Sequence, residues 1–368
     1  MNAEKDLSLE PPDIYTKPGA KYLKKNRQWQ GIPGIERTPN GRLWAALYSG
    51  GDTEGPDNYV ALILSEDDGV TWSDPVLAVD PPGLVRAFDP CLWHDPAGRL
   101  WLFWAQSYGF YDGRAGVWAM VSNNADASVP AWSEPRRIVD GVMMNKPTVL
   151  SSGEWLLPCA VWGFRDKEGI QVASDYNHLP EQMYSNVISS LDNGESFQLV
   201  GQVDMPSRSY DEHMLVEKTN GDIWMLVRTY GGIGECFSSD KGRTWSAPKA
   251  DVLEGPCSRF FIRRLHSGNL LLINHHAFEG RNNLSAMVSR DDGNSWEGFL
   301  LLDERDNVSY PDGVETEDGL IYVIYDRERY ADKEIYLAVF EEKDVLAGKG
   351  VTDRARLKVL VEEGSSTF

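Results

Sequence analysis

A short motif of the form Ser-x-Asp-x-Gly-x-(Thr/Ser)-Trp occurs three times in this chain. The copies begin at Ser65, Ser238 and Ser289, and a fourth copy, which begins at Ser190, ends in Phe197 in place of the Trp. In such a turn the Asp carboxylate accepts backbone N–H groups, the Gly takes a left-handed conformation, and the Trp packs between neighbouring sheets. The motif therefore predicts a fold built from repeated units, and it carries no chemistry of its own.

A second repeat predicts a hairpin in each unit. A Gly follows polar turn residues and opens a short apolar run at six places that are roughly 50 residues apart. The six positions are Gly41, Gly98, Gly153, Gly221, Gly268 and Gly319. Units of this length, each with four short strands, are typical of β-propeller blades. We therefore predict an all-β fold, a six-bladed β-propeller with Asp-box repeats, as the Ser-x-Asp-x-Gly turns are called.

The propeller is predicted to use residues 1–368 as a single domain, because the repeats extend along nearly the whole chain. Residues 1–25 lie ahead of the repeats and are interpreted as a lead-in segment. The apolar run within residues 350–368 is a possible strand that closes the ring.

The composition excludes several classes of function. The formal net charge is −20, which argues against nucleic acids and anionic membrane surfaces as partners. The N-terminus is polar and no run of 18 apolar residues occurs, so we expect a cytoplasmic protein, or a secreted or periplasmic one if a signal sequence has been removed. The four Cys lack metal-binding spacing and are predicted to be buried thiols. No cofactor motif or metal site is indicated, and the oligomeric state is not predicted.

The register of the six Gly residues places ionisable side chains at one mouth of the axial channel. Nine residues before each Gly, at the expected start of the inner strand, lie Ile32, Asp89, Met144, Glu212, Arg259 and Tyr310. Seven residues after each Gly, where the second strand returns to the same rim, lie Tyr48, Ala105, Ala160, Arg228, His275 and Asp326. The loops that follow contribute Asp52 and Arg281. Acids, bases and arginines that converge on a concave surface predict a ligand-binding site.

Tyr310 and Glu212 form the most informative pair in this set. A Tyr hydroxyl is a weak nucleophile unless a carboxylate accepts its proton, and Glu212 occupies the equivalent position two blades away. Asp52 is placed to protonate a leaving group, and Arg228 and Arg281 suit bidentate binding of a carboxylate. A neutral phenol fits an anomeric carbon that carries a carboxylate, because charge repulsion is avoided. The further candidates for substrate binding are Arg259, Asp89, His275 and Asp326.

Four segments that carry these residues resemble the sialidase (neuraminidase) family. In chain order they are GGDTEGPDN (50–58), DEHMLVEKTNGDIWMLVRT (211–229), GRNNLSAMVSRDDGNSW (280–296) and VSYPDGVETEDG (308–319). By this resemblance Tyr310 is the nucleophile, Glu212 its partner and Asp52 the acid/base, while Arg228 and Arg281 are two of the three arginines that bind the substrate carboxylate. The resemblance implies an exo-acting hydrolase that releases a terminal acidic sugar, either sialic acid or a related 2-keto sugar acid, from a glycan.

The resemblance fails at one position. Sialidases open with an Arg-Ile-Pro motif whose Arg is the first of the three arginines, whereas this chain reads WQGIPGIE (29–36), with Gly31 in that place. Losing one charged donor of such a clamp costs roughly 100-fold in binding. Arg259 lies at the same rim in the glycine register and is a candidate substitute. Equally, Gly31 fits a site rebuilt for a different sugar acid.

Two other functions fit the same residues. One is a different carbohydrate-active propeller, either a uronate- or rhamnose-releasing hydrolase or a polysaccharide lyase. In a lyase, Tyr310 or His275 would serve as proton donor or base. A non-catalytic glycan-binding propeller is the third interpretation, because Asp boxes also occur in propellers that lack activity. Both Tyr310 and Glu212 are present, which favours an enzyme.

Overall fold

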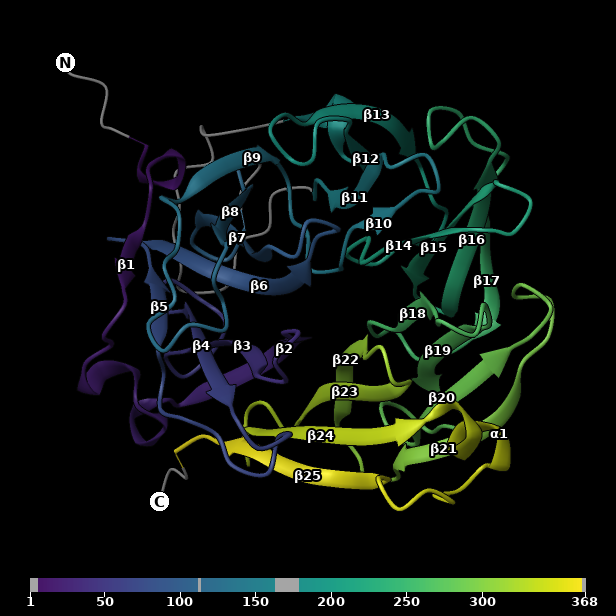
Figure 1. The fold of residues 1–368 in the computed structure, drawn as a ribbon. Helices are drawn as coiled ribbons and strands as arrows, with labels where there is room; N and C mark the ends of the chain where they lie inside the picture. The colour runs from purple at the N-terminus through teal and green to yellow at the C-terminus, as the bar shows by residue number, and fades with distance from the viewer. Residues whose placement is uncertain (1–5, 112–113, 163–178, 366–368) are drawn as a thin grey trace.

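The computed structural model describes residues 6–111, 114–162 and 179–365. Its strands form six sheets that are arranged in a ring around a central axis (Figure 1). Each sheet is antiparallel and is made of strands that follow one another along the chain, apart from one N-terminal strand added to the first sheet. The prediction of an all-β, six-bladed β-propeller is confirmed.

The strand bounds are as follows. The first blade contains β2 (Trp29–Arg37), β3 (Leu43–Gly50), β4 (Tyr59–Ser65) and β5 (Leu77–Asp80), with β1 (Asp13–Tyr15) at its outer edge. The second contains β6 (Val85–His94), β7 (Leu100–Tyr108), β8 (Gly116–Ser122) and β9 (Arg136–Asp140), and the third β10 (Thr148–Val149), β11 (Trp155–Ala160), β12 (Ser185–Ser190) and β13 (Gln198–Val203).

The other three blades follow the same order. The fourth contains β14 (Met214–Glu217), β15 (Ile223–Thr229), β16 (Gly232–Ser238) and β17 (Lys249–Glu254), and the fifth β18 (Phe261–Arg264), β19 (Leu270–His275), β20 (Leu284–Ser289) and β21 (Glu297–Asp303). The sixth contains β22 (Val308–Glu315), β23 (Leu320–Arg327), β24 (Glu334–Glu341) and β25 (Arg356–Glu363). The helices are α1 (Glu342–Ala347) and the 3-10 turns η1 (Leu7–Leu9), η2 (Ala20–Tyr22), η3 (Lys24–Asn26) and η5 (Pro180–Gln182). None of the helices in the described ranges is long and apolar enough to cross a membrane.

The six repeated Gly residues lie in the turns between the inner strand and the second strand of each blade, as predicted. Their φ angles fall between 77° and 98°, in the left-handed region that favours Gly. At Gly98, for example, a Cβ atom would meet nothing within 4 Å, so backbone conformation and not space requires the glycine there.

Three inner strands share a β-bulge at the position where the glycine register placed the site. In β2, β6 and β22 two residues oppose one residue of the neighbouring strand, and the first of the two precedes a Pro. These first residues are Ile32, Asp89 and Tyr310, with φ values of 48°, 48° and 55°. A bulge changes the direction of a side chain relative to a regular strand. In β22 the bulge directs Tyr310 to Glu212 of the fourth blade. The Glu212 carboxylate accepts a hydrogen bond from the Tyr310 hydroxyl.

The Asp boxes are structural turns, as predicted. In each, one Asp oxygen accepts the backbone N–H of the Thr or Ser four residues on, and the other oxygen accepts that residue's hydroxyl. These hydrogen bonds lower the pKa of Asp67, Asp192, Asp240 and Asp291 to about 2. The aromatic residue that ends each motif packs against a hydrophobic cluster shared by neighbouring blades.

Replacing Asp240 by Ala is therefore expected to lower the unfolding temperature at pH 6 by an amount that shrinks as the pH falls. The pKa of Asp240 is depressed in the folded protein, so its contribution to stability is present above pH about 4 and disappears toward pH 2. Calorimetry of both proteins at several pH values between 6 and 2 measures this difference. A gap in unfolding temperature that is independent of pH would contradict the assignment.

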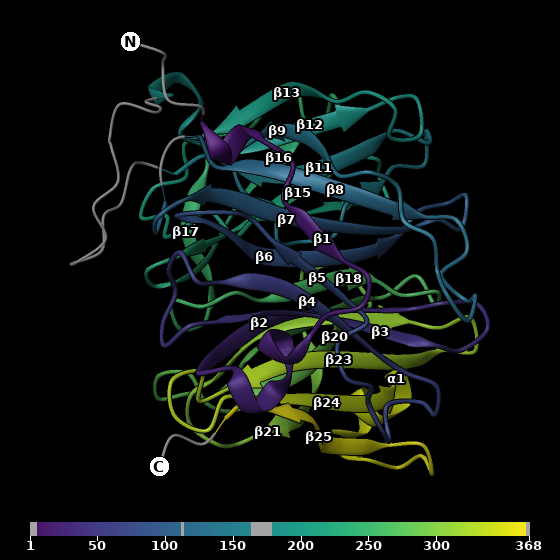
Figure 2. The same ribbon diagram turned by 90° about the vertical axis from the view of Figure 1, so that its left-hand side faces the viewer.

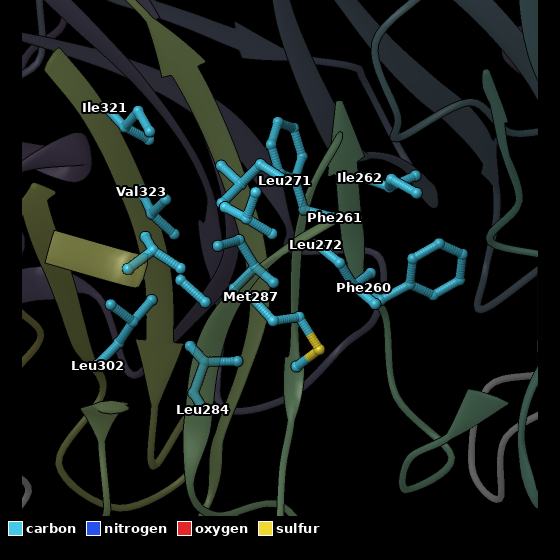
Figure 3. Packing of buried hydrophobic residues seen from close by; sticks show 14 of the residues in the cluster. Phe260, Phe261, Ile262, Leu271, Leu272, Leu284, Met287, Leu302, Ile321 and Val323 are labelled. Atoms are coloured by element: carbon cyan, nitrogen blue, oxygen red, sulfur yellow. The ribbon is translucent and has the colours of Figure 1, made fainter. Parts of the chain in front are cut away.

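The ring closes by packing and not by a shared strand. The possible ring-closing strand within residues 350–368 is β25, which is the outer strand of the sixth blade, so that expectation was wrong. The first and sixth blades are held together by a common hydrophobic cluster, and Arg27, just ahead of β2, forms an ion pair with Glu362 of β25. Part of the lead-in, β1, lies against β5 on the outside of the first blade (Figure 2). A cluster shared by the fourth, fifth and sixth blades shows the same packing between neighbours. Figure 3 shows its residues from the fifth blade beside Ile321 and Val323 of the sixth.

A buried ion network fills the axial channel further along the inner strands. The Lys146 ammonium donates to the carbonyl oxygens of Ile35 and Leu92, at 2.6 and 2.5 Å. It also lies 3.1 Å from the Glu36 carboxylate and 3.4 Å from that of Asp312. All three charged side chains are buried, so the channel is closed beneath its mouth by paired charges.

Candidate active site

Tyr310, Glu212 and Arg228 form one hydrogen-bonded group at the mouth of the channel. The Tyr310 hydroxyl donates to Glu212 Oε1 over 2.8 Å and accepts from Arg228 Nη1 over 2.9 Å. Arg228 Nη1 also lies 2.7 Å from Glu212 Oε1. The three side chains come from the sixth and fourth blades and are buried. A carboxylate is thus in position to accept the phenol proton, and an arginine stabilises the negative charge that remains.

Burial keeps the phenol of Tyr310 neutral in the free protein. Burial itself is the largest effect and raises the pKa of Tyr310 above its ordinary value of 10.0; the negative charge of Glu212 raises it further, and Arg228 opposes both. The proton therefore leaves the oxygen only when the oxygen reacts. Until then an anionic substrate meets no phenolate charge.

The backbone before Glu212 is strained in a way that serves the site. Tyr210 and Asp211 are consecutive non-glycine residues with φ values of 61° and 39°. Asn145 Nδ2 holds the next turn of chain by donating to the carbonyl oxygens of Glu212 and His213, at 3.1 and 2.9 Å. Such strain persists only where the surroundings enforce it, and it is concentrated at functional sites.

Arg281 reaches the same tyrosine from the fifth blade. Its guanidinium lies 5.5 Å from the centre of the Tyr310 ring, and its Nη2 donates to the carbonyl of Cys257 over 2.8 Å. The ring of His275 bonds to the carbonyl of Asn282 at 2.6 Å, so it supports the loop that carries Arg281. Burial lowers the pKa of His275 to about 4, which leaves its ring neutral at pH 7.

Arg329 is a site residue that the sequence analysis missed. It lies in the loop between β23 and β24, and its guanidinium is 4.5 Å from the centre of the Tyr310 ring. Its aliphatic stem covers Gly31, where a Cβ atom would overlap the Cδ atom of Arg329 and lie 2.5 Å from its Cγ. The space that the absent family arginine would leave is thus occupied by an arginine from another blade. In the sequence, the signal for this arrangement is Gly31, which stands where the family resemblance leads us to expect an arginine.

Asp326 was predicted to bind substrate, and the structure places it behind Arg329. Its carboxylate is fully buried, accepts the backbone N–H of Ile32 at 2.7 Å and the hydroxyl of Ser309 at 2.8 Å, and lies 3.5 Å from Arg329 Nε. Asp326 therefore orients Arg329.

Arg259 does not substitute for the missing arginine, as had been considered. Its side chain is 1% exposed, and it donates to Asn145 Oδ1 at 2.7 Å and to the carbonyl of Met144 at 3.0 Å. It also lies 3.6 Å from Asp312. Arg259 lies two residues before β18, and its side chain joins the ion network that fills the channel.

Three carboxyl groups lie on the side of the mouth formed by the first and second blades. Asp52, the predicted acid/base, is exposed in the loop between β3 and β4. The negative charge of Glu54, two residues further along, raises the pKa values of Asp89 and Arg329. Asp89 is buried, and burial followed by the charge of Glu54 raises its pKa to about 8. Asp89 is therefore protonated at pH 7.

Aromatic side chains form a buried cluster behind Tyr310. Trp29 packs on Tyr48 with ring centres 4.6 Å apart, and Tyr111 packs on Trp162, which packs on Tyr210, at 5.0 and 5.2 Å. Trp162 and Tyr210 are only partly buried, and such rings suit the apolar face of a sugar. Arg86 of β6 holds the cluster by donating to the Tyr48 hydroxyl and to the carbonyl of Phe110. Across the described ranges, no three His, Cys, Asp or Glu side chains are grouped as metal ligands.

The repeated turns and the six sheets define a propeller of the Asp-box class. The chain belongs to the BNR repeat-like domain family, whose model matches residues 41–323. A comparison with curated protein sequences finds no match.

Three solved structures show how widely this fold is shared. The Hadza microbial sialidase Hz136 is 19% identical with a TM-score of 0.61, and the match covers 81% of this chain and 63% of that one. The intramolecular trans-sialidase from Ruminococcus gnavus is 14% identical with a TM-score of 0.65, covering 94% and 99%. An α-L-arabinanase from Penicillium chrysogenum is also 14% identical, with a TM-score of 0.60 and coverage of 91% and 100%. The likeness establishes the fold, and the substrate has to be argued from the site.

Proposed function

We propose that this protein is an exo-acting glycoside hydrolase that releases a terminal acidic sugar, sialic acid or a related 2-keto sugar acid. The hydrogen bond of 2.8 Å from the Tyr310 hydroxyl to Glu212 Oε1 is the observation that carries this proposal. It pairs a neutral nucleophile with its base beside three guanidinium groups, those of Arg228, Arg281 and Arg329. An anomeric carbon that bears a carboxylate is the electrophile that suits this arrangement.

The reaction follows from the positions of these groups. Glu212 accepts the phenol proton while Tyr310 Oη bonds to the anomeric carbon, and the bond from that carbon to the leaving oxygen breaks. The leaving oxygen takes a proton from a carboxyl group at the rim, a role that the family resemblance assigns to Asp52. Water then attacks the anomeric carbon of the glycosyl–tyrosine and gives its proton to the carboxylate left at Asp52. The bond from that carbon to Tyr310 Oη breaks, Tyr310 recovers its proton from Glu212, and the sugar leaves with retained anomeric configuration.

A panel of fluorogenic aryl glycosides tests the substrate class. We expect turnover of the glycosides of N-acetylneuraminic acid or another 2-keto sugar acid, and none of neutral galactose or arabinose glycosides. Turnover of neutral glycosides alone would contradict the proposal. Cleavage of a uronate polymer with an unsaturated, ultraviolet-absorbing product would instead identify a lyase.

Activity on an anionic glycoside is expected to fall as the pH rises through about 8. Asp89 has a raised pKa of about 8, so its neutral form is the one present below that pH. Above it, the new carboxylate lies close enough to Glu212 for their charges to interact, and it repels the substrate anion. The pH profile of kcat/KM measures this loss, and Asp89→Asn should remove it.

A comparison of substrates with different leaving groups separates the role of Asp52 from that of Asp89. If Asp52 is the proton donor, Asp52→Asn slows substrates with a poor leaving group far more than those with an activated aryl group, and Asp89→Asn does not. An unchanged alkaline limb in Asp89→Asn would show that Asp89 does not govern the pH dependence.

A further inference from the structure

We propose that Arg329 is the third carboxylate-binding arginine of this site and that Gly31 is the residue that makes room for it. The inference rests on the proposed function only in taking a sugar carboxylate as the natural ligand. It assigns the anion clamp to Arg228, Arg281 and Arg329, which come from the fourth, fifth and sixth blades.

Steric complementarity links the two positions. The backbone of Gly31 is not in the left-handed region, so its conformation does not call for glycine. A Cβ atom at Gly31 would overlap the stem of Arg329 and lie 2.9 Å from Asp326 Oδ2. Glycine at position 31 is therefore required by the presence of Arg329 and its partner. An arginine at position 31 and the observed Arg329 exclude each other.

Arg329 is held in a defined orientation by part of its guanidinium group, and other N–H groups of the guanidinium remain to bind a ligand. Its Nε faces Asp326 at 3.5 Å, its Nη2 lies 3.4 Å from Ser309 Oγ, and its side chain is 13% exposed. Asp326 is itself fixed by the N–H of Ile32 and the Ser309 hydroxyl. An arginine pre-organised in this way loses little freedom when it binds a carboxylate.

The guanidinium groups around Tyr310 differ in their partners within the protein. Arg228 is paired with Glu212 and Arg329 with Asp326, whereas Arg281 donates to the carbonyl oxygen of Cys257. All three lie against Tyr310, which is the side on which the proposed substrate binds. A carboxylate or sulfate group is the ligand that such converging guanidinium groups bind.

Calorimetric titration with sodium sulfate and with N-acetylneuraminic acid, at constant ionic strength, tests the assignment. We expect Arg329→Ala to weaken binding of both by about 10- to 100-fold. Arg327→Ala is the matched control, because Arg327 lies on the same stretch of chain and pairs with Asp332 and Glu334 away from the site. It removes the same charge, and its affinity should equal that of the wild type.

Gly31→Ala tests the steric link without removing any charge. The added methyl group displaces the stem of Arg329, so anion binding should weaken as it does in Arg329→Ala. In the double variant Gly31→Ala/Arg329→Ala the second change should add nothing further, because both act through the same guanidinium. Effects that add in full would overturn the link between the two positions.

The two ligands separate this inference from the proposed function. Sulfate binding that depends on Arg329, without binding or turnover of any sugar acid, would support the clamp and refute the sialidase-like activity. Sulfate affinity that is equal in wild type and Arg329→Ala would refute the clamp, whatever substrate the enzyme hydrolyses. Absence of anion binding by the folded wild-type protein would refute it as well.

Discussion

Replacing Tyr310 by Phe is expected to lower kcat/KM on the preferred acidic glycoside by at least about 1,000-fold. The change removes one oxygen, and that oxygen is the proposed nucleophile. Arg228 and Glu212 remain paired at 2.7 Å without it, so the protein should lose only about 0.5–1.5 kcal/mol of stability, the net worth of an ordinary hydrogen bond. Steady-state kinetics beside thermal unfolding separates the chemical loss from any loss of folded protein.

Tyr325 provides the matched control for this experiment. Its hydroxyl is also buried and donates to a carboxylate, Asp303 Oδ2, at 3.0 Å, and the same carboxylate is paired with Arg305, which is not one of the three arginines at Tyr310. Tyr325→Phe should keep the wild-type turnover. A Tyr310→Phe protein that retained more than about a tenth of the activity would rule out Tyr310 as the nucleophile.

Replacing Lys146 by Met is expected to destabilise the protein by about 3–5 kcal/mol. Burial disfavours each charge in the network, yet the opposite charges prevail: the pKa of Glu36 is lowered and that of Lys146 is raised. Without the ammonium, Glu36 and Asp312 would be two buried carboxylates that repel each other, and two carbonyl oxygens would lose their donor.

Denaturant unfolding at pH 7 measures this loss. Lys25 is exposed, and Lys25→Met makes the same change of side chain with an expected effect within about 0.5 kcal/mol. The double variant Lys146→Met/Asp312→Asn should recover part of the stability, because it removes one of the two buried carboxylates that repel each other once the ammonium is gone. A loss below about 1 kcal/mol in Lys146→Met would show that the network does not stabilise the channel.

The fold could be predicted because its signals are local. The Asp at position 67 bonds to Thr71, four residues away, and the hairpin Gly residues need only their own left-handed φ angle. Counting such turns gives the number of blades without any knowledge of long-range contacts. The strand formed by residues 356–363 was misplaced because an apolar run does not specify its partner, which here is β24 of the same blade.

The sequence by itself determined the six blades, the register positions of Tyr310, Glu212 and Arg228, and the common mouth that they share, because each follows from turn chemistry and a constant register. Only the tertiary structure decided which charges meet. Arg259 is directed to Asn145 and Asp312, whereas Arg329, from a loop outside the register, reaches across Gly31 to Tyr310. A long arginine side chain can span the gap between blades, so its partner depends on the side chains packed around it. The spacing of residues along the chain does not determine that packing.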